Sequence, residues 1–112
     1  MILWQLVSLE IIYLADQKKL EITDNQIRER LREQLHITDE KIDYAYSLYD
    51  FAKQKFSKEQ FDKMGELFQL NEKGKEYMRQ EDYDNGMGIL GEVLWEMGEL
   101  FGTNIPDPES LN

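Results

Sequence analysis

The chain has 112 residues, a length that corresponds to one domain. Hydrophobic residues make up 41% of it and aromatic residues 12%, which is typical of a globular protein and excludes a disordered chain. The absence of cysteine and the single histidine, His36, exclude disulfides, thiolate chemistry and a multi-histidine metal site. The first apolar run lacks the basic segment and cleavage site of a signal peptide, so the cytoplasm is the expected location.

Charge is distributed unevenly along the chain. The net charge is −10, from 23 acidic and 13 basic residues, and every basic residue lies at or before Arg79. The part that follows repels phosphate backbones and anionic lipid and attracts basic partners. A solvated surface without a partner is the alternative interpretation. The acidic residues of this part are Glu81, Asp82, Asp84, Glu92, Glu96, Glu99, Asp107 and Glu109.

Residues 2–14 predict the helix around which the fold is organised. Apolar side chains fall on nearly every side of a helical wheel, and only Gln5 and Ser8 form a narrow polar seam. Such a helix must be covered by other elements, and it is too short to span a membrane, which needs about 20 apolar residues. We therefore expect residues 2–15 to be the buried central helix of a bundle. Glu10 lies off the seam, and we expect it to be paired or neutralised.

N-cap residues and hydrophobic staples predict three further helices. Thr23, Thr38 and Ser57 are the expected N-caps, and each follows an apolar residue that can pack on the first helical turn. No segment shows a sustained period of two, so no sheet is expected. The expected apolar stripes are Ile27, Leu31 and Leu35, then Ile42, Ala45, Tyr49, Ala52 and Phe56, and then Phe61, Met64 and Phe68 in a short fourth helix.

The last third of the chain predicts a helical hairpin. Asn71 is the expected cap of a helix that reaches about Gln80, residues 81–86 form the turn, and a long helix follows up to Phe101. Gly residues in this long helix lower its stability, and a neighbouring helix that approaches closely would compensate. The expected apolar stripe is Met87, Leu90, Leu94, Met97 and Phe101, and the expected site of close approach is Gly91 with Gly98.

Together these elements predict an all-α fold. It is a compact bundle of five to six helices around the buried N-terminal helix, and it ends in the helical hairpin. We expect one domain over residues 1–102. Residues 103–112, with two prolines and no basic residue, are expected to be an exposed acidic tail.

The hairpin residues 71–101, about a quarter of the chain, resemble one tetratricopeptide repeat. The resemblance implies a protein-binding role, because that family presents concave helical surfaces to peptides. No second copy occurs one repeat length upstream. The matching positions are Gly74 and Tyr77 on the first helix, followed by Tyr83, Gly86, Leu90 and Val93.

Residues 23–56 also resemble a helix-turn-helix, and residues 70–78 are similar to the closing segment of many winged-helix domains. The expected recognition helix would place Asp39, Glu40 and Asp43 at the phosphates and base edges. This opposes DNA binding, because phosphate contacts dominate affinity. A DNA-binding regulator is therefore an alternative rather than the favoured function.

Two acidic patterns near the hairpin turn partly fit metal sites. Residues 81–92 place Gly86 and Glu92 as a calcium loop requires, but Tyr83 falls at a ligand position. Two spaced carboxylate pairs are similar to those that hold magnesium in all-α pyrophosphohydrolases, but no basic residue follows them to bind a phosphate. We expect no cofactor, and a magnesium-dependent nucleotide hydrolase is the less favoured alternative. The two pairs are Glu81 with Asp84 and Glu96 with Glu99.

These features favour a non-enzymatic protein–protein interaction module that binds a basic partner. Trp95 lies off the main stripe and is flanked by carboxylates, as in an aromatic hot spot, although packing against another helix is the competing explanation. A sharper hypothesis is an inhibitor that presents carboxylates in place of phosphates, as nucleic-acid mimics of phages and mobile elements do. We expect no binding to nucleic acid or membrane, and a homodimer stays open. The expected contact residues are Glu81, Asp82, Asp84, Glu92, Trp95, Glu96 and Glu99, with Tyr44 and Phe51 as a further exposed strip.

Overall fold

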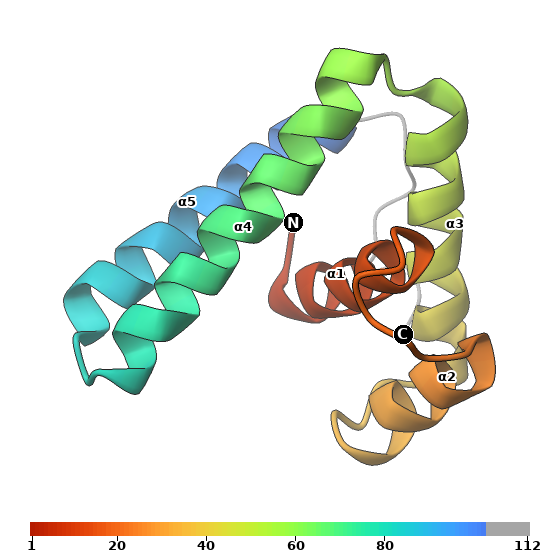
Figure 1. The fold of residues 1–112 in the computed structure, drawn as a ribbon, viewed down its shortest axis with the longest axis horizontal. Coiled ribbons are helices and arrows are strands. Elements are labelled where there is room, and N and C mark those ends of the chain that lie inside the picture. Colours follow the sequence, from red (N-terminus) through yellow and green to blue (C-terminus); the bar gives the residue numbers. More distant parts are fainter. Residues whose placement is uncertain (103–112) are drawn as a thin grey trace. The chain divides into compact units, whose positions relative to one another are not determined.

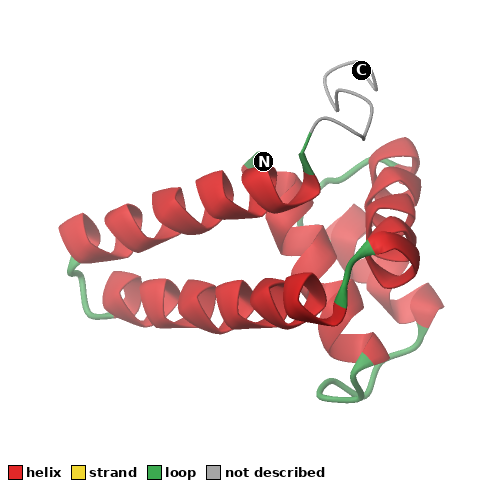
Figure 2. Ribbon diagram, turned by 90° about the horizontal axis from the view of Figure 1, so that it is seen from above, coloured by secondary structure: helices red, strands yellow, loops and turns green. Residues whose placement is uncertain are grey.

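A computed structural model describes residues 1–102 as five α-helices and the turns between them (Figure 1). These residues contain no strand, and helices are the only regular elements drawn in Figure 2. The predicted all-α class is therefore confirmed, whereas the predicted tail lies outside the described residues. The helices are α1 (Leu3–Asp16), α2 (Asp24–Glu33), α3 (Asp39–Lys55), α4 (Lys58–Arg79) and α5 (Tyr83–Phe101).

The described residues fall into two compact units. One is Ile2–Gln54, which contains α1, α2 and α3, and the other comprises residues 55–102 together with Met1 and contains α4 and α5. The single domain expected over residues 1–102 stays a prediction.

The helix starts expected from N-cap residues are confirmed. The Thr23 N–H donates to Gln26 Oε1 at 2.9 Å, and the Gln26 N–H donates to Thr23 Oγ1 at 3.2 Å, which completes a capping box on α2. Ser57 and Gln60 form the same box on α4. Thr38 Oγ1 accepts a backbone N–H from the first turn of α3 at 3.3 Å. These bonds satisfy N–H groups that a helix start otherwise leaves without partners.

The polar seam of α1 is buried together with much of its apolar surface. Gln5 and Ser8 are buried, and only 4% of Glu10 is exposed, whereas Ile2 and Leu3 at the start of α1 are about half exposed. Gln5 Oε1 accepts the N–H of Ile2 at 3.1 Å and so serves the first turn. The expected burial of the N-terminal helix is confirmed, but its exposed end is apolar.

Aromatic edges join α1 to α3 within the first unit. The ring centroids of Trp4 and Tyr44 are 6.1 Å apart, and those of Tyr13 and Tyr49 are 6.4 Å apart, both in edge-on geometry. The exposed strip predicted from Tyr44 and Phe51 is wrong, since both side chains are half-buried.

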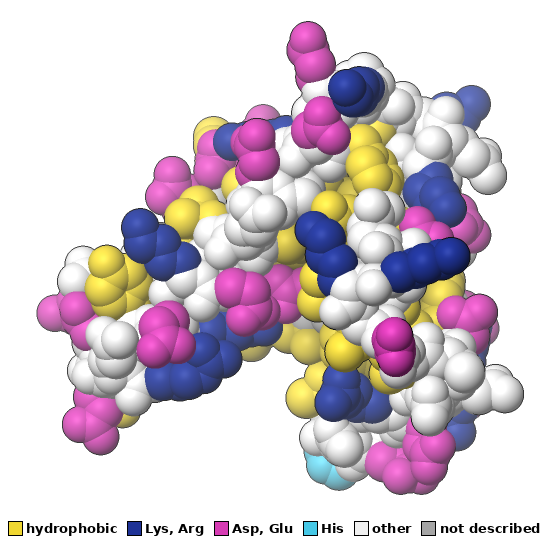
Figure 3. All heavy atoms as spheres, viewed as in Figure 1, with side chains coloured by type: hydrophobic (Ala, Val, Ile, Leu, Met, Phe, Trp, Pro, Cys, Tyr) yellow, Lys and Arg dark blue, Asp and Glu magenta, His cyan; other side chains and the backbone are white. Residues whose placement is uncertain are grey.

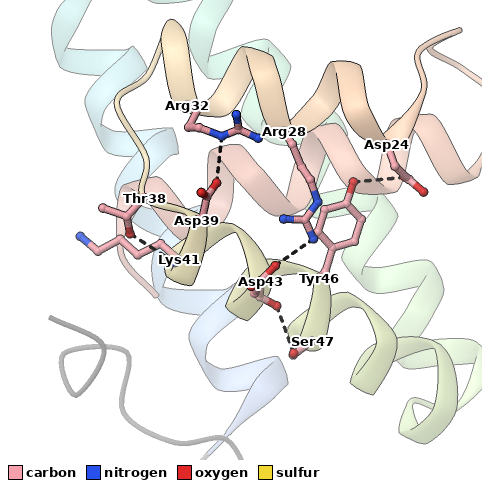
Figure 4. A network of polar contacts seen from close by, with 9 residues as sticks. All are labelled: Asp24, Arg28, Arg32, Thr38, Asp39, Lys41, Asp43, Tyr46 and Ser47. Carbon is pink, nitrogen blue, oxygen red and sulfur yellow. Dashed lines mark hydrogen bonds and ion pairs between the residues drawn. The ribbon is translucent and has the colours of Figure 1, made fainter.

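Ion pairs join α2 to α3 (Figure 4). Arg28 Nη2 lies 2.8 Å from Asp43 Oδ1, and Arg32 Nε lies 2.8 Å from Asp39 Oδ1. The Arg28 guanidinium also lies over the ring of Tyr46, at 5.0 Å from its centroid. Such solvent-accessible pairs add little stability each, and they lie where the two helices meet.

The break predicted at Asn71 is wrong. α4 runs without interruption through 22 residues, and Asn71 is 2% exposed in its interior. Leu67, Phe68 and Gly74 are buried before and after it on the same helix. The preference of asparagine for a helix cap is weaker than the stabilisation gained by burying this part of α4. Tertiary packing therefore continues the helix through Asn71.

α4 and α5 lie antiparallel and side by side (Figures 1 and 2), and glycines bring their backbones close. A Cβ on Gly86 would lie 2.6 Å from Met78 Sδ and 3.1 Å from the carbonyl oxygen of Gly74. A Cβ on Gly74 would lie 3.0 Å from Ile89 Cγ2. The helices therefore meet closely near the turn of the hairpin.

Three expected contacts of the apolar pattern differ in the structure. A Cβ on Gly91 would meet nothing within 4 Å, so the predicted close approach there is wrong, and at Gly98 the neighbour is the terminal amino nitrogen rather than a helix. Leu35 is 45% exposed because it lies past the end of α2. Met87 is 56% exposed, since it is rotated by about 100° around α5 from the buried Gly86.

Candidate interaction surface

α5 carries the exposed large apolar side chains of the second unit, with Met87 about 80° and Tyr83 about 120° around the helix from Trp95. Within residues 55–102 these are Tyr83 and Met87, each 56% exposed, and Trp95, 66% exposed. Val93 and Met97, on the other side of the helix, are fully buried. Trp95 therefore does not pack against another helix within the described residues. Large apolar groups left in water forgo the stabilisation of burial, and clusters of them often mark binding surfaces.

Two carboxylates flank Trp95 on its side of the helix. Glu92 precedes Trp95 by three residues and Glu99 follows it by four, the spacings at which side chains on a helix are neighbours. Both are exposed, and Asp84 lies on the same face about 16 Å further towards the start of α5. On the other flank of Trp95, the terminal amino group donates to the carbonyl of Leu94 at 3.3 Å.

Exposed glycines leave bare backbone beside Trp95. Gly88 and Gly91 precede it by seven and four residues, so they share its side of the helix. A Cβ on either would meet nothing within 4 Å, and packing between described residues gives no reason for glycine at these positions. We use the name α5 face for the surface made by Asp84, Met87, Gly88, Gly91, Glu92, Trp95 and Glu99.

The remaining predicted contact residues pair with other side chains or lie in the turn between α4 and α5. Glu96 Oε1 lies 3.7 Å from Lys63 Nζ on α4. Asp82 is the N-cap of α5 and accepts from the Asn85 N–H at 3.5 Å and from Asn85 Nδ2 at 2.7 Å. Glu81 occupies the left-handed backbone region, with φ of 62°, between α4 and α5. The structure thus brings together Glu92, Trp95 and Glu99 but not all seven residues.

The negative charge of the hairpin is concentrated on α5. α4 carries five basic and five acidic residues, whereas α5 carries four acidic residues and no basic one. Within α4, Lys75 pairs with Glu72 at 3.0 Å and Arg79 with Glu76 at 2.7 Å. Figure 3 shows acidic and basic side chains intermixed along the course of α4. α4 therefore balances its own charge, and α5 does not.

A hollow between α1 and α3 was not found by sequence reasoning. It has a volume of about 410 Å³, and its walls include Asp16, Tyr49 and Lys53. The Tyr49 hydroxyl donates to Asp16 Oδ2, and Lys53 Nζ lies 3.2 Å from the same oxygen. The hydrogen bond from Tyr49 and the charge of Lys53 lower the pKa of Asp16, and burial raises the pKa of Tyr49. These polar groups satisfy one another, which favours a structural role.

The geometry also bears on the alternative functions. Arg28 and Arg32, the cations of α2 nearest to α3, pair with Asp43 and Asp39 rather than facing solvent alone. Residues 83–92 are helical, so the loop needed for a calcium site is not formed. Among residues 1–102, no group of three or more histidine or acidic side chains is placed to hold a metal ion.

Comparison of the chain with known protein families, with curated proteins and with solved structures finds no match. The tetratricopeptide resemblance of residues 71–101 therefore stays a prediction. Among the helices in the described part of the chain, none has the length and apolar character needed to cross a membrane.

Proposed function

We propose that the protein is a non-enzymatic interaction module that binds a basic surface of another protein through the α5 face. The observation that carries this proposal is the exposure of Trp95, at 66%, between two exposed carboxylates on a helix without basic residues. Tryptophan is enriched among interface residues with large binding energy, and complementary charge speeds and orders association.

Several local choices on the α5 face lower helix stability. Gly88 and Gly91 each cost roughly 1 kcal/mol relative to alanine in a helix interior. Glu99 lies in the last turn, where the helix dipole disfavours negative charge, and Trp95 leaves apolar area in water. When a sequence departs from local stability at adjacent positions, function is the usual reason.

A protein partner fits this face better than the role of a nucleic-acid mimic. A mimic needs an extended array of negative charges, whereas the α5 face interleaves three carboxylates with Met87, Trp95 and two glycines. This mixture of apolar centre and charged flanks is the usual composition of a protein interface. The inhibitor hypothesis is therefore kept only in its broader form, as occlusion of a basic protein surface.

The test is affinity capture with matched charge variants. Glu92→Gln/Glu99→Gln removes two charges seven residues apart on α5, and Glu59→Gln/Glu66→Gln removes two charges at the same spacing on α4. We expect wild type and the α4 variant to retain a basic protein, and the α5 variant to lose it. Capture should weaken as salt rises from 50 to 300 mM. Equal loss in both variants, or no loss in the α5 variant, would exclude the α5 face as the binding surface.

A further inference from the structure

The α5 face has three conceivable occupants, and its charge selects among them. Residues 103–112 contain two acidic residues and no basic one, so this segment does not complement Asp84, Glu92 and Glu99. A second copy would bring the same carboxylates against themselves in a two-fold interface, within a chain of net charge −10. A cationic segment of another protein is the occupant that the charge favours.

The position of Trp95 between two carboxylates specifies the cation further. Along the helix axis Glu92 lies about 4.5 Å before Trp95 and Glu99 about 6 Å after it. A group that covers the indole ring is therefore within side-chain reach of both carboxylates. Such a group must be flat enough to stack on the ring and must carry hydrogen-bond donors at its edges.

From this arrangement we infer that the partner presents an arginine whose guanidinium stacks on Trp95 and donates to Glu92 and Glu99. The guanidinium is planar, is weakly hydrated and carries five donors in a fixed plane. It can stack and pair with carboxylates at once, whereas a lysine ammonium is a compact point charge. This inference rests on the proposed function and names the residue type that the α5 face selects.

The glycines beside Trp95 support a close approach by the segment that carries the arginine. Gly88 and Gly91 leave open space where side chains would stand, so the partner backbone can lie against α5. An arginine side chain has to fold back over Trp95 from that position, which bulkier residues at 88 and 91 would obstruct. Alanine at both positions should therefore weaken the complex even though it strengthens the helix.

Defined peptides test the inference directly. Fluorescently labelled deca-arginine and deca-lysine, which have equal length and charge, are titrated with the full chain, and binding is measured by anisotropy. We expect deca-arginine to bind about three- to tenfold more tightly, and this preference to fall below twofold in Trp95→Leu. In a Trp4→Phe background, Trp95 is the one remaining tryptophan, and its emission should change on binding deca-arginine.

The outcomes separate the inference from the proposed function. Equal binding of both peptides that is lost in Glu92→Gln/Glu99→Gln overturns the arginine inference and leaves the acidic surface in place. A preference for arginine that persists in Trp95→Leu excludes Trp95 as the side chain on which the guanidinium stacks. Binding that falls equally in Glu92→Gln/Glu99→Gln and Glu59→Gln/Glu66→Gln overturns both. The circular dichroism of Trp95→Leu, Glu92→Gln/Glu99→Gln and Glu59→Gln/Glu66→Gln should match wild type, because the substituted side chains are exposed.

Discussion

At the scale of single residues, the glycines of α5 lie in two opposite environments, one crowded and one open. Gly86 is buried against Met78 and the Gly74 carbonyl, and any side chain there would have to displace them. Gly88 and Gly91 have open space instead. The first glycine is explained by packing within the hairpin, whereas packing between described residues does not explain the other two.

Alanine substitutions distinguish the glycine that packing requires from the two that have open space around them. Gly88→Ala and Gly91→Ala should each raise the free energy of unfolding by roughly 0.5–1 kcal/mol, because alanine favours the helix and meets no neighbour. Gly86→Ala should lower it by roughly 1–2 kcal/mol, since overpacking outweighs the gain in helix propensity. Urea unfolding followed by circular dichroism measures all three. Destabilisation by Gly91→Ala would show that this glycine has a packing role.

Sequence reasoning succeeded at residues whose roles are local. Thr23 and Ser57 cap helices through partners three residues away, and that spacing is visible in the sequence. Asn71 and Trp95 depend on contacts made across the fold. The propensity of asparagine for a cap is overridden by burial, and whether Trp95 packs or faces solvent depends on where the partner helix lies. That the Trp95 side of α5 faces solvent could have been predicted from Gly88 and Gly91, which lie on the same side of the helix.

At the scale of elements, α1 is joined to α3 by a cluster around one carboxylate. Asp16 ends α1, and it accepts from the Tyr49 hydroxyl and pairs with Lys53, both on α3. These contacts lower the pKa of Asp16, so they favour the ionised form in the folded state. A similar contact exists between α2 and α3, where burial and the nearby Asp24 raise the pKa of Tyr46 to about 12.

The lowered pKa of Asp16 predicts a pH dependence of stability. A carboxyl whose folded pKa lies below its unfolded value of 3.8 stabilises the fold above that value, and this contribution is lost as pH falls through the folded pKa. Asp16→Asn should cost roughly 1 kcal/mol at pH 7, a low value for a charged hydrogen bond because Asp16 is exposed. Between pH 5 and pH 2, the stability of the Asp16→Asn variant should then decline less than that of wild type.

Thermal unfolding at a series of pH values measures this difference. Asp50→Asn is the matched control, since Asp50 is an exposed aspartate on α3 that also borders the hollow. The control should follow the wild-type decline. Parallel curves for Asp16→Asn and wild type would mean that the cluster does not contribute to acid stability.

At the scale of the whole molecule, charge repulsion is the main electrostatic feature. The net charge of −10 arises from 23 acidic and 13 basic residues, and each ion pair described is at least partly open to solvent. Exposed pairs contribute little, whereas excess like charge destabilises a compact state. Salt should therefore stabilise the fold more by screening repulsion than it destabilises it by weakening ion pairs.

Raising NaCl from 20 to 300 mM should increase the melting temperature by a few degrees. A variant with glutamine at Glu59, Glu66, Glu92 and Glu99 has a net charge of −6, and its melting temperature should respond less to salt. Differential scanning calorimetry measures both. A melting temperature that falls with salt would show that ion pairs dominate instead.

The continuity of α4 has a consequence for how the hairpin moves. Its 22 residues span about 33 Å as a single rod, with Asn71 inside and not at a joint. The residues before and after Asn71 therefore cannot hinge against each other without breaking backbone hydrogen bonds at a buried point. Strain applied at the hairpin tip is transmitted along the rod to the Ser57 end rather than absorbed midway, which makes the tip and its opposite end mechanically coupled.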